Sequence, residues 1–414
     1  MKRFQSFCLT LLGSTCLLAA QDRDFRTDIN PALRYYEAMI LGADSPQADR
    51  DYLLTNEWQG QNLSERFGKL VSQYDNPFKL VRQAAQASVP CDWGIDFSPG
   101  PETLLPHLAR CKALVQMAKL RVLWDLQKGK DMEAADDLVG AFALARNASQ
   151  DGTLISVLVQ FAAQALVISS VEANYGRFSP AALQRLEQGM EAAPPGRSIS
   201  SSLRSAEKDC FHGWLEKKIA RWRIEHQGDE AKVMADLHAL FHSMSSDTEA
   251  TNDWDRSLMA IKSSGEVLDL LREEEAVYQK AADILALPPG QFEEQAGPFR
   301  TQVEQSPNPF VKLTFPAILN AGKKQFRADA RLALCRAAIA YKLRGEDGLR
   351  SVRDPFGQGP LQFERFVFQG VDRGFKLSSA YKENGLPEAL IFVEKEGPPF
   401  YLDGAARLGQ PLSK

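Results

Sequence analysis

The chain has 414 residues, of which 44% are hydrophobic and 25% are charged. This length buries a sizeable core without disulfide or metal staples, and the composition excludes wholesale disorder, a collagen-like repeat and a polytopic membrane protein. A formal net charge of −4 and a pI near 5.9 give no global electrostatic reason to bind nucleic acid, so no nucleic-acid partner is predicted.

The first 20 residues predict a secretory signal peptide. Lys2 and Arg3 form a positive start, residues 4–20 carry no charge, and small residues precede Gln21. Polar residues dilute the apolar stretch, which favours cleavage over a retained N-terminal anchor. We therefore expect an exported protein, periplasmic or secreted, with 47 basic and 53 acidic residues and a mature charge of −6.

The mature chain keeps four cysteines, Cys91, Cys111, Cys210 and Cys335. In an oxidising compartment they allow three pairings, and Cys91 and Cys111 are the closest pair in sequence. The alternative is that they are small buried hydrophobes, as the apolar surroundings of Cys335 suggest. The sequence leaves the pairing open.

Nearly every periodic segment between Asn30 and Arg344 predicts a helix. Residues 103–128 and 132–146 carry apolar stripes separated by a polar turn, which predicts an αα-hairpin. Three pairs of a capping residue and a proline mark helix starts. They are Asn30-Pro31, Ser45-Pro46 and Ser179-Pro180.

Residues 152–171 form an uncharged stretch of about the length of a membrane span. Ser156, Gln160 and Gln164 recur every four residues and would form one polar face. That pattern favours the central helix of a helical bundle, although the sequence does not decide between the two.

The next segments are rich in charge and poor in breakers. Residues 197–244 predict one long helix or two collinear helices, interrupted near Gln227-Gly228-Asp229. Residues 253–287 predict another helix, which ends at Pro288-Pro289. Asn308-Pro309 opens a further segment, and residues 328–343 are strongly helical in pattern.

After Gly345 the pattern changes to short apolar and aromatic runs separated by turns. The runs cover residues 361–369, 374–381 and 389–394. The predicted fold is therefore mainly α, an irregular multi-helix bundle with αα-hairpins and a small C-terminal antiparallel β-meander. The predicted organisation is a signal peptide (1–20), a helical domain (21–345), and a meander with a C-terminal tail docked on the helices (346–414).

Two blocks of sequence resemble a group of uncharacterised exported helical proteins of planctomycetes, verrucomicrobia and similar bacteria. One block begins at Cys91-Asp92-Trp93 and runs into the predicted hairpin, and the other joins the last helix to Asp354-Pro355-Phe356. The second block also resembles the C-terminal region of some pilin-like secretion proteins. Gly357-Gln358-Gly359 departs from the usual spacing, and the usual glycine- and aspartate-rich tail is missing. The resemblance implies a fold and no catalytic residues.

Asp354-Pro355-Phe356 has a structural interpretation. Asp354 accepts a backbone hydrogen bond, Pro355 fixes φ, and Phe356 anchors the turn in the core. A ligand site there is the less favoured interpretation.

Two sets of side chains have the types and spacing of metal ligands. His238 and His242 share a helix face, with Asp236 and Asp247 as the nearest carboxylates, but the motif lacks glutamate after the first histidine. Cys91, His107 and Cys111 form the second set. We favour surface histidines for the first set and, for His107, contacts to backbone groups near its loop, so no metal site is predicted.

Hydrolysis of a polysaccharide requires two carboxylates in one cleft, with aromatic rings to stack on the sugar. The candidate carboxylates are Glu57, Asp92, Asp96, Asp136 and Asp137, and the candidate rings are Trp58 and Trp93. Asp136 and Asp137 also fit a solvated helix face, and Asp92-Trp93 fits a cap followed by a core anchor.

Other catalytic motifs are missing from the sequence, including a nucleophile elbow, a phosphate-binding loop and a dinucleotide fingerprint, so neither a cofactor nor a catalytic residue is predicted. Lys217, Lys218, Arg221 and Arg223, interleaved with Trp214 and Trp222, form a basic run that Glu216 and Glu225 offset. The favoured function is an interaction or scaffold protein of the cell envelope, whose partner is another envelope protein. The alternative is an enzyme that acts on envelope polysaccharide.

Overall fold

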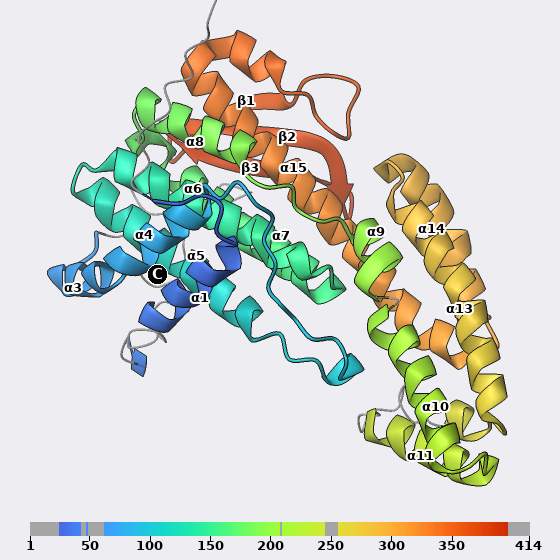
Figure 1. Ribbon diagram of the computed structural model, residues 1–414. Coiled ribbons are helices and arrows are strands. Elements are labelled where there is room, and N and C mark those ends of the chain that lie inside the picture. The colour runs from blue at the N-terminus through green and yellow to red at the C-terminus, as the bar shows by residue number, and fades with distance from the viewer. Residues whose placement is uncertain (1–24, 43–46, 49–61, 208, 245–255, 396–414) are drawn as a thin grey trace, which may run out of the picture.

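The computed structural model describes residues 25–42, 47–48, 62–207, 209–244 and 256–395. It confirms a mainly α fold closed by a small antiparallel sheet. Figure 1 shows two parts, and we call residues 25–198 and 327–395 the body and residues 199–326 the arm, which projects away from it.

The body begins with helices whose starts follow the sequence. Its helices are α1 (Pro31–Leu41), α3 (Glu65–Gln73), α4 (Asp75–Ala84), α5 (Pro106–Gln127), α6 (Asp131–Ala148), α7 (Leu154–Asn174) and α8 (Pro180–Ala192), with short 3₁₀ turns η2 (Gly100–Glu102), η3 (Ser149–Asp151) and η4 (Tyr175–Arg177). The side chain of Asn30 accepts a hydrogen bond from the Ala32 amide, and Ser179 caps α8 in the same way. The predicted caps at Asn30 and Ser179 are confirmed, whereas Ser45-Pro46 lies outside the described residues.

The α5–α6 pair is the predicted αα-hairpin, and its turn contains Gly129 at φ +74°. Helix α5 begins at Pro106, three residues later than predicted, because proline is favoured in the first helical turn. Leu104 therefore precedes the helix and is 83% exposed. The apolar stripe that the sequence predicts within residues 103–128 therefore does not include Leu104.

Helix α7 is the one described helix long and apolar enough to span a membrane. It contacts α5, α6, α15 and the sheet, so it packs as the central helix of the body. Ser156, Gln160 and Gln164 are buried against this core rather than exposed to solvent. Gln160 accepts hydrogen bonds from Ser149 and from the backbone of Arg197, which satisfies its carbonyl oxygen inside the body.

The arm contains a second hairpin. Its elements are α9 (Ile199–Ser202), two π-helical turns (Leu203–Glu207 and Asp209–Gly213), α10 (Trp214–Glu225), α11 (Glu230–Met244), α13 (Ser264–Leu285) and α14 (Pro289–Glu304). Gln227 and Gly228 have positive φ, and the chain turns so that α11 packs against α10. The predicted collinear arrangement of these helices is therefore wrong. Ser263 caps α13, which starts later than the prediction from residue 253.

The π-helical turn Asp209–Gly213 is held by a buried contact between a histidine and a glutamate. His212 Nε2 lies 2.6 Å from Glu274 Oε2 of α13, and both side chains are almost completely buried. The His212 ring also meets Tyr278 edge-on. This pair ties the start of α10 to the long helix α13.

Helix α15 (Pro309–Ser351) runs from the arm through the body, and its helical backbone is interrupted at Gly345. The sheet follows in the order β1 (Gln362–Phe368), β2 (Val371–Glu383), β3 (Leu386–Val393), with antiparallel pairing throughout. Asn384-Gly385 turns β2 into β3 with both φ values positive, as in tight hairpins.

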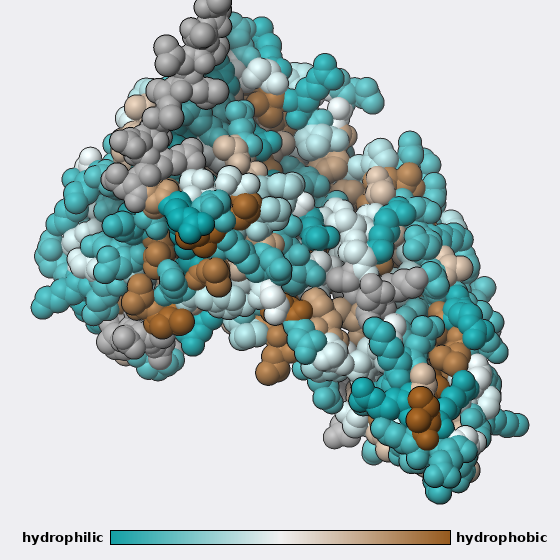
Figure 2. Space-filling model, viewed as in Figure 1, coloured by the Kyte–Doolittle hydropathy of each residue, from teal (hydrophilic) through white to brown (hydrophobic). Residues whose placement is uncertain are grey.

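The sheet packs on the helices through one apolar face. Phe375, Leu377 and Phe392 share a core with Leu334 of α15 and residues of α4–α8. A second core joins α9, α13, α14 and α15, and a third fills the end of the arm between α10, α11 and α13. Figure 2 shows a mainly hydrophilic surface with hydrophobic atoms gathered over α1, where Leu33, Ile40 and Leu41 are exposed.

Candidate functional site

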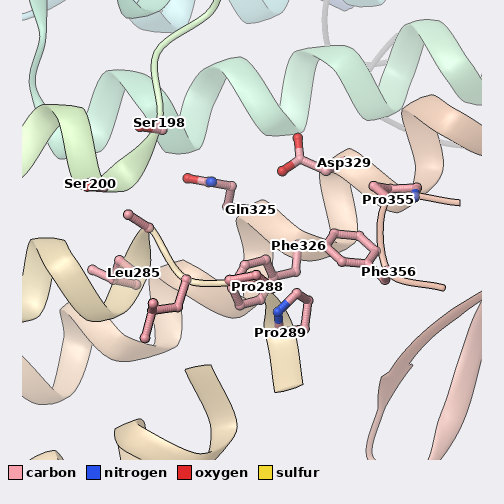
Figure 3. A pocket seen from close by; sticks show the side chains of 12 residues that line it. Ser198, Ser200, Leu285, Pro288, Pro289, Gln325, Phe326, Asp329, Pro355 and Phe356 are labelled. Carbon is pink, nitrogen blue, oxygen red and sulfur yellow. The ribbon is translucent and has the colours of Figure 1, made fainter. Parts of the chain in front are cut away.

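A pocket of about 430 Å³ lies where the body and the arm meet. We call it the junction pocket. Figure 3 shows that its walls come from α9, the α13–α14 link, α15 and the Asp-Pro-Phe turn. It is lined by Ser198, Ser200, Leu285, Ala286, Leu287, Pro288, Pro289, Gln325, Phe326, Asp329, Pro355 and Phe356.

One wall of the junction pocket is aromatic and rigid. Phe326 meets Phe356 edge-on with ring centroids 5.8 Å apart, and Phe356 packs on Tyr381 of β2 at 5.3 Å. Pro288, Pro289 and Pro355 complete an apolar surface beside these rings (Figure 3). Such a surface suits the apolar body of a ligand or side chain.

Asp354 fixes the position of the aromatic wall. Its carboxylate accepts hydrogen bonds from the Phe356 amide (3.0 Å), the Ser379 hydroxyl (2.7 Å) and the Ala380 amide (2.6 Å). Asp354 is buried, so these bonds hold the turn firmly on β2. The predicted role of Asp354 as a backbone acceptor and of Phe356 as an anchor is confirmed, and the same turn also lines the pocket.

The polar wall comes from one face of α15. Gln325 accepts a hydrogen bond of 2.8 Å from the Ile199 amide and thereby fixes the start of α9. Asp329, one turn further along, is an exposed residue at the pocket edge, and its partly desolvated carboxylate has no hydrogen bond and no ion pair within 4 Å to any residue that the structure describes. Burial of its surroundings raises the pKa of Asp329 to about 6, although Arg146 opposes this shift. The pocket therefore combines an aromatic wall with an available carboxylate.

The cysteine cluster near the start of α5 is structural. Cys91 and Cys111 are buried free thiols, as are the other cysteines in the described residues apart from the half-buried Cys210. The hypothesised bridge between Cys91 and Cys111 is not formed. Burial raises the pKa of Cys91 to about 12 and also raises that of Cys111, so both thiolates are suppressed. Cys335 is completely buried on α15, as the alternative interpretation predicts.

His107 binds a carboxylate rather than the backbone groups that we predict from the sequence. Its Nε2 lies 3.1 Å from Asp151 Oδ2, and its ring stacks on Trp93 at 4.5 Å. Burial alone would raise the pKa of Asp151, but hydrogen bonds, including that from His107, lower it. Trp93 donates to the Asn147 carbonyl, so this group anchors the loop before α5 in the core.

Within the described residues, no group of three or more His, Cys, Asp or Glu side chains has the arrangement of a metal site. His242 is exposed and His238 is half-buried on α11. Asp236 lies 2.7 Å from His226 instead, and Asp247 lies outside the described residues. The described members of the two candidate sets are therefore not assembled into a metal site.

The candidate catalytic carboxylates are separated and engaged. Asp92 and Asp96 accept hydrogen bonds from Gly94 and Ser98 in their own loop, and Asp136 pairs with Arg185. Glu57 and Trp58 lie outside the described residues. None of the described candidates lines the junction pocket.

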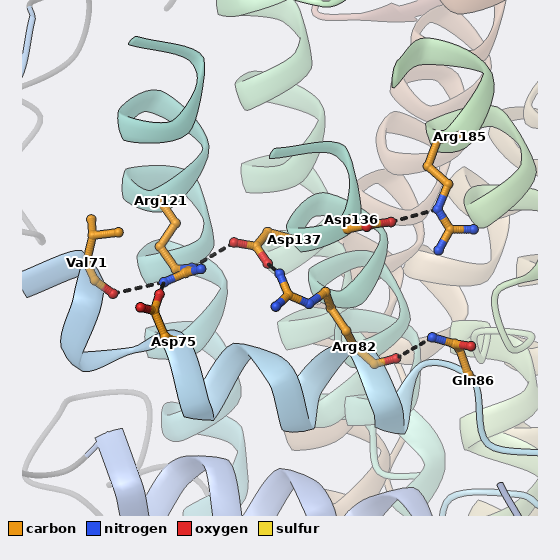
Figure 4. A network of polar contacts seen from close by, with 8 residues as sticks. All are labelled: Val71, Asp75, Arg82, Gln86, Arg121, Asp136, Asp137 and Arg185. Atoms are coloured by element: carbon orange, nitrogen blue, oxygen red, sulfur yellow. Dashed lines mark hydrogen bonds and ion pairs between the residues drawn. The ribbon is translucent and has the colours of Figure 1, made fainter. Parts of the chain in front are cut away.

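The sequence is compatible with a solvated helix face that carries Asp136 and Asp137. Asp137 does not lie on such a face, because it is completely buried. Figure 4 shows it between two guanidinium groups, with Arg82 at 2.6 Å and Arg121 at 2.7 Å. Arg121 also binds Asp75 and the Val71 carbonyl. The network joins α4, α5 and α6, and neutralisation by the arginines explains how a carboxylate faces the core.

The basic run on α10 is mixed in charge and partly engaged. Lys218 lies between the rings of Trp214 and Trp222, at 5.1 and 5.3 Å from their centroids. Arg223 donates to the Ser264 hydroxyl of α13. These contacts fix α10 within the arm.

Sequence reasoning missed Gln325, Phe326 and Asp329 as site residues. They lie in a helical stretch crowded with Lys and Arg, where a single Asp has the pattern of a solvated helix face. Four separate segments form the pocket, so no local spacing reveals it. The proline pair and the Asp-Pro-Phe turn were visible only as breakers and turns.

Comparison with known proteins yields no match to a protein-family model, a curated protein or a solved structure.

Proposed function

We propose that this protein is an exported interaction protein of the cell envelope that holds a segment of a partner protein in the junction pocket. The observation that carries the proposal is the pocket itself, whose lining combines a packed aromatic and proline wall with the carboxylate of Asp329. Pockets of this size with few placed polar groups suit a side chain or short segment. The position between body and arm also leaves the occupant in contact with both.

Ala286 provides the test, because it is exposed and lines the pocket. A photo-crosslinking residue at position 286 should capture a partner in intact cells, and the same residue at the exposed Glu133 of α6 should not. The captured protein, purified, should bind the wild-type chain. Ala286→Arg should weaken that binding at least about tenfold by filling the pocket, and Ala286→Ser should not.

Identical adducts at positions 286 and 133 would reject the proposal, as would unchanged binding by Ala286→Arg. The melting temperatures of the Ala286 variants should match that of the wild type, because the side chain is exposed.

Export is part of the same proposal and is tested separately. Fractionation followed by N-terminal sequencing should find the chain outside the cytoplasm, beginning near Gln21. Full-length protein in the cytoplasm would contradict it. Activity on envelope polysaccharide stays a prediction from the sequence. It gains no support from Asp92, Asp96, Asp136 and Asp137, because their carboxylates make structural contacts.

A further inference from the structure

The carboxylate of Asp329 lacks a hydrogen-bond donor among the described residues of the junction pocket. It is exposed within the pocket and makes no hydrogen bond or ion pair to the described residues. The side-chain carbonyl oxygen of Gln325, one turn away, accepts a hydrogen bond from the Ile199 amide. An occupant that supplies a charged hydrogen-bond donor would gain a charge-assisted contact, which is about twice as strong as a neutral one.

Arg146 is a cation that interacts electrostatically with Asp329, and its Nε is buried without a hydrogen-bond partner among the described residues. Its guanidinium lies over the Phe142 ring, 5.2 Å from the ring centroid, and forms no ion pair with Asp329. Burial and the neighbouring Arg336 lower the pKa of Arg146, while Asp329 raises it. Arg336 itself donates to the Met190 carbonyl. Arg146 therefore favours the charged form of Asp329 without forming a hydrogen bond or ion pair with its oxygens.

The aromatic wall favours an occupant that carries an apolar group next to its cationic group. Phe326, Phe356 and the three prolines give apolar surface to the same pocket that Asp329 lines (Figure 3). An aliphatic stem lies well on such a surface while its charged end stays at the polar edge. A lysine side chain combines this stem with a compact ammonium group.

We infer that the junction pocket recognises a lysine side chain, with its ammonium group on Asp329 and its stem along Phe326 and Phe356. The inference rests on the proposed function in taking the occupant to be part of a partner protein. It adds the chemistry that selects this occupant.

The test uses Nα-acetyl-lysine methylamide as the ligand and titrates it into the mature full chain by NMR. The norleucine analogue is the neutral control and the glutamate analogue is the anionic control. Saturable binding of the lysine compound alone is expected. Asp329→Asn should weaken it at least about tenfold. Asp283→Asn, which alters an exposed carboxylate of α13 paired with Arg204, should leave it unchanged.

The pH dependence provides a second readout. Affinity for the lysine compound should fall as the pH drops through about 6, the pKa of Asp329, and should be flat in Asp329→Asn. Arginine guanidinium groups keep their charge over this pH range, so they contribute no slope.

Equal binding of the norleucine or glutamate analogue would overturn the inference, and so would no saturable binding or an unaffected Asp329→Asn variant. The proposed function and the assignment of the ammonium group to Asp329 are rejected by different results. If the lysine compound does not bind but Ala286→Arg still loses the partner, the proposed function stands and the ammonium assignment is wrong. If the compound binds but Ala286→Arg keeps the partner, the proposed function is wrong.

Discussion

Asp125 is a buried carboxylate whose Oδ2 atom has no hydrogen-bond partner in the described part of the chain. Burial raises its pKa to about 6, and Arg121 only partly offsets this. Because the folded state holds this proton more tightly than the unfolded state, ionisation costs stability above pH 6. The cost disappears as the pH falls from about 6 to about 4.

Asp125→Asn should therefore raise the free energy of unfolding by about 1–2 kcal/mol at pH 7.5 and have little effect near pH 4. Urea unfolding at the two pH values measures this difference. A similar loss of stability at both pH values would show instead that the carboxylate itself holds the end of α5.

At the residue scale, the sequence predicts what depends on near neighbours. The caps at Asn30 and Ser179 need only the following turn of backbone, and both are present. Asp137 depends on Arg82 and Arg121, which lie 55 and 16 residues away, so its burial was not predictable from its own helix.

At the scale of elements, helix–helix packing in the body depends on a charge network as well as on apolar stripes. Asp137 is the centre of the network that joins α4, α5 and α6, while its neighbour Asp136 binds the half-exposed Arg185. Adjacent carboxylates on one helix therefore have very different environments. Removal of the buried one leaves Arg82 without its ion pair and leaves Arg121 with only Asp75 and the Val71 carbonyl.

Asp137→Ala should lower the free energy of unfolding by about 3–5 kcal/mol, the cost of uncompensated buried charge. Asp136→Ala is the matched control and should lower it by less than about 1 kcal/mol. Chemical unfolding of the two variants measures both. Comparable losses would mean that the network is not the stabilising element.

Element types were more predictable than element boundaries. Periodicity identifies the α5–α6 hairpin and the meander because each depends on contiguous sequence. The turn at Gln227-Gly228 was visible as a break, but its direction depends on the apolar faces of α10 and α11 meeting in the arm.

At the scale of the whole molecule, the loop before α5 connects the body to the arm. Gly100 has φ +66°, and a Cβ atom there would lie 2.3 Å from the ring of Trp214 at the start of α10. Backbone and packing both require glycine at this position. The contact helps to set the orientation of the arm beside the junction pocket.

Gly100→Ala should lower stability by about 2–4 kcal/mol, from strain and from displacement of Trp214. Gly129→Ala is the matched control, since Gly129 has φ +74° and open space around it, and should cost about 1 kcal/mol. Thermal unfolding together with tryptophan fluorescence measures the two effects. Equal losses would show that the contact with Trp214 contributes nothing.

The overall class of fold follows from the sequence, but the division into body and arm does not. That division and the pocket depend on how α9, α13, α14 and α15 meet across more than a hundred residues of chain, through a shared core that includes Phe292, Phe315 and Phe326. The apolar patterns of these helices predict that each helix packs in a core, but they do not identify the helices against which it packs.

The three-stranded sheet has two outer edges, and they are not equivalent. Glu172 of α7 accepts a hydrogen bond of 3.0 Å from the Ile391 amide of β3, so a helix side chain already occupies backbone hydrogen-bonding capacity on that edge. Unpaired edges invite extension by a strand from another chain. Among the described residues no strand pairs with the outer edge of β1, so strand addition, whether by aggregation or by a partner's extended peptide, is expected along β1 rather than along β3.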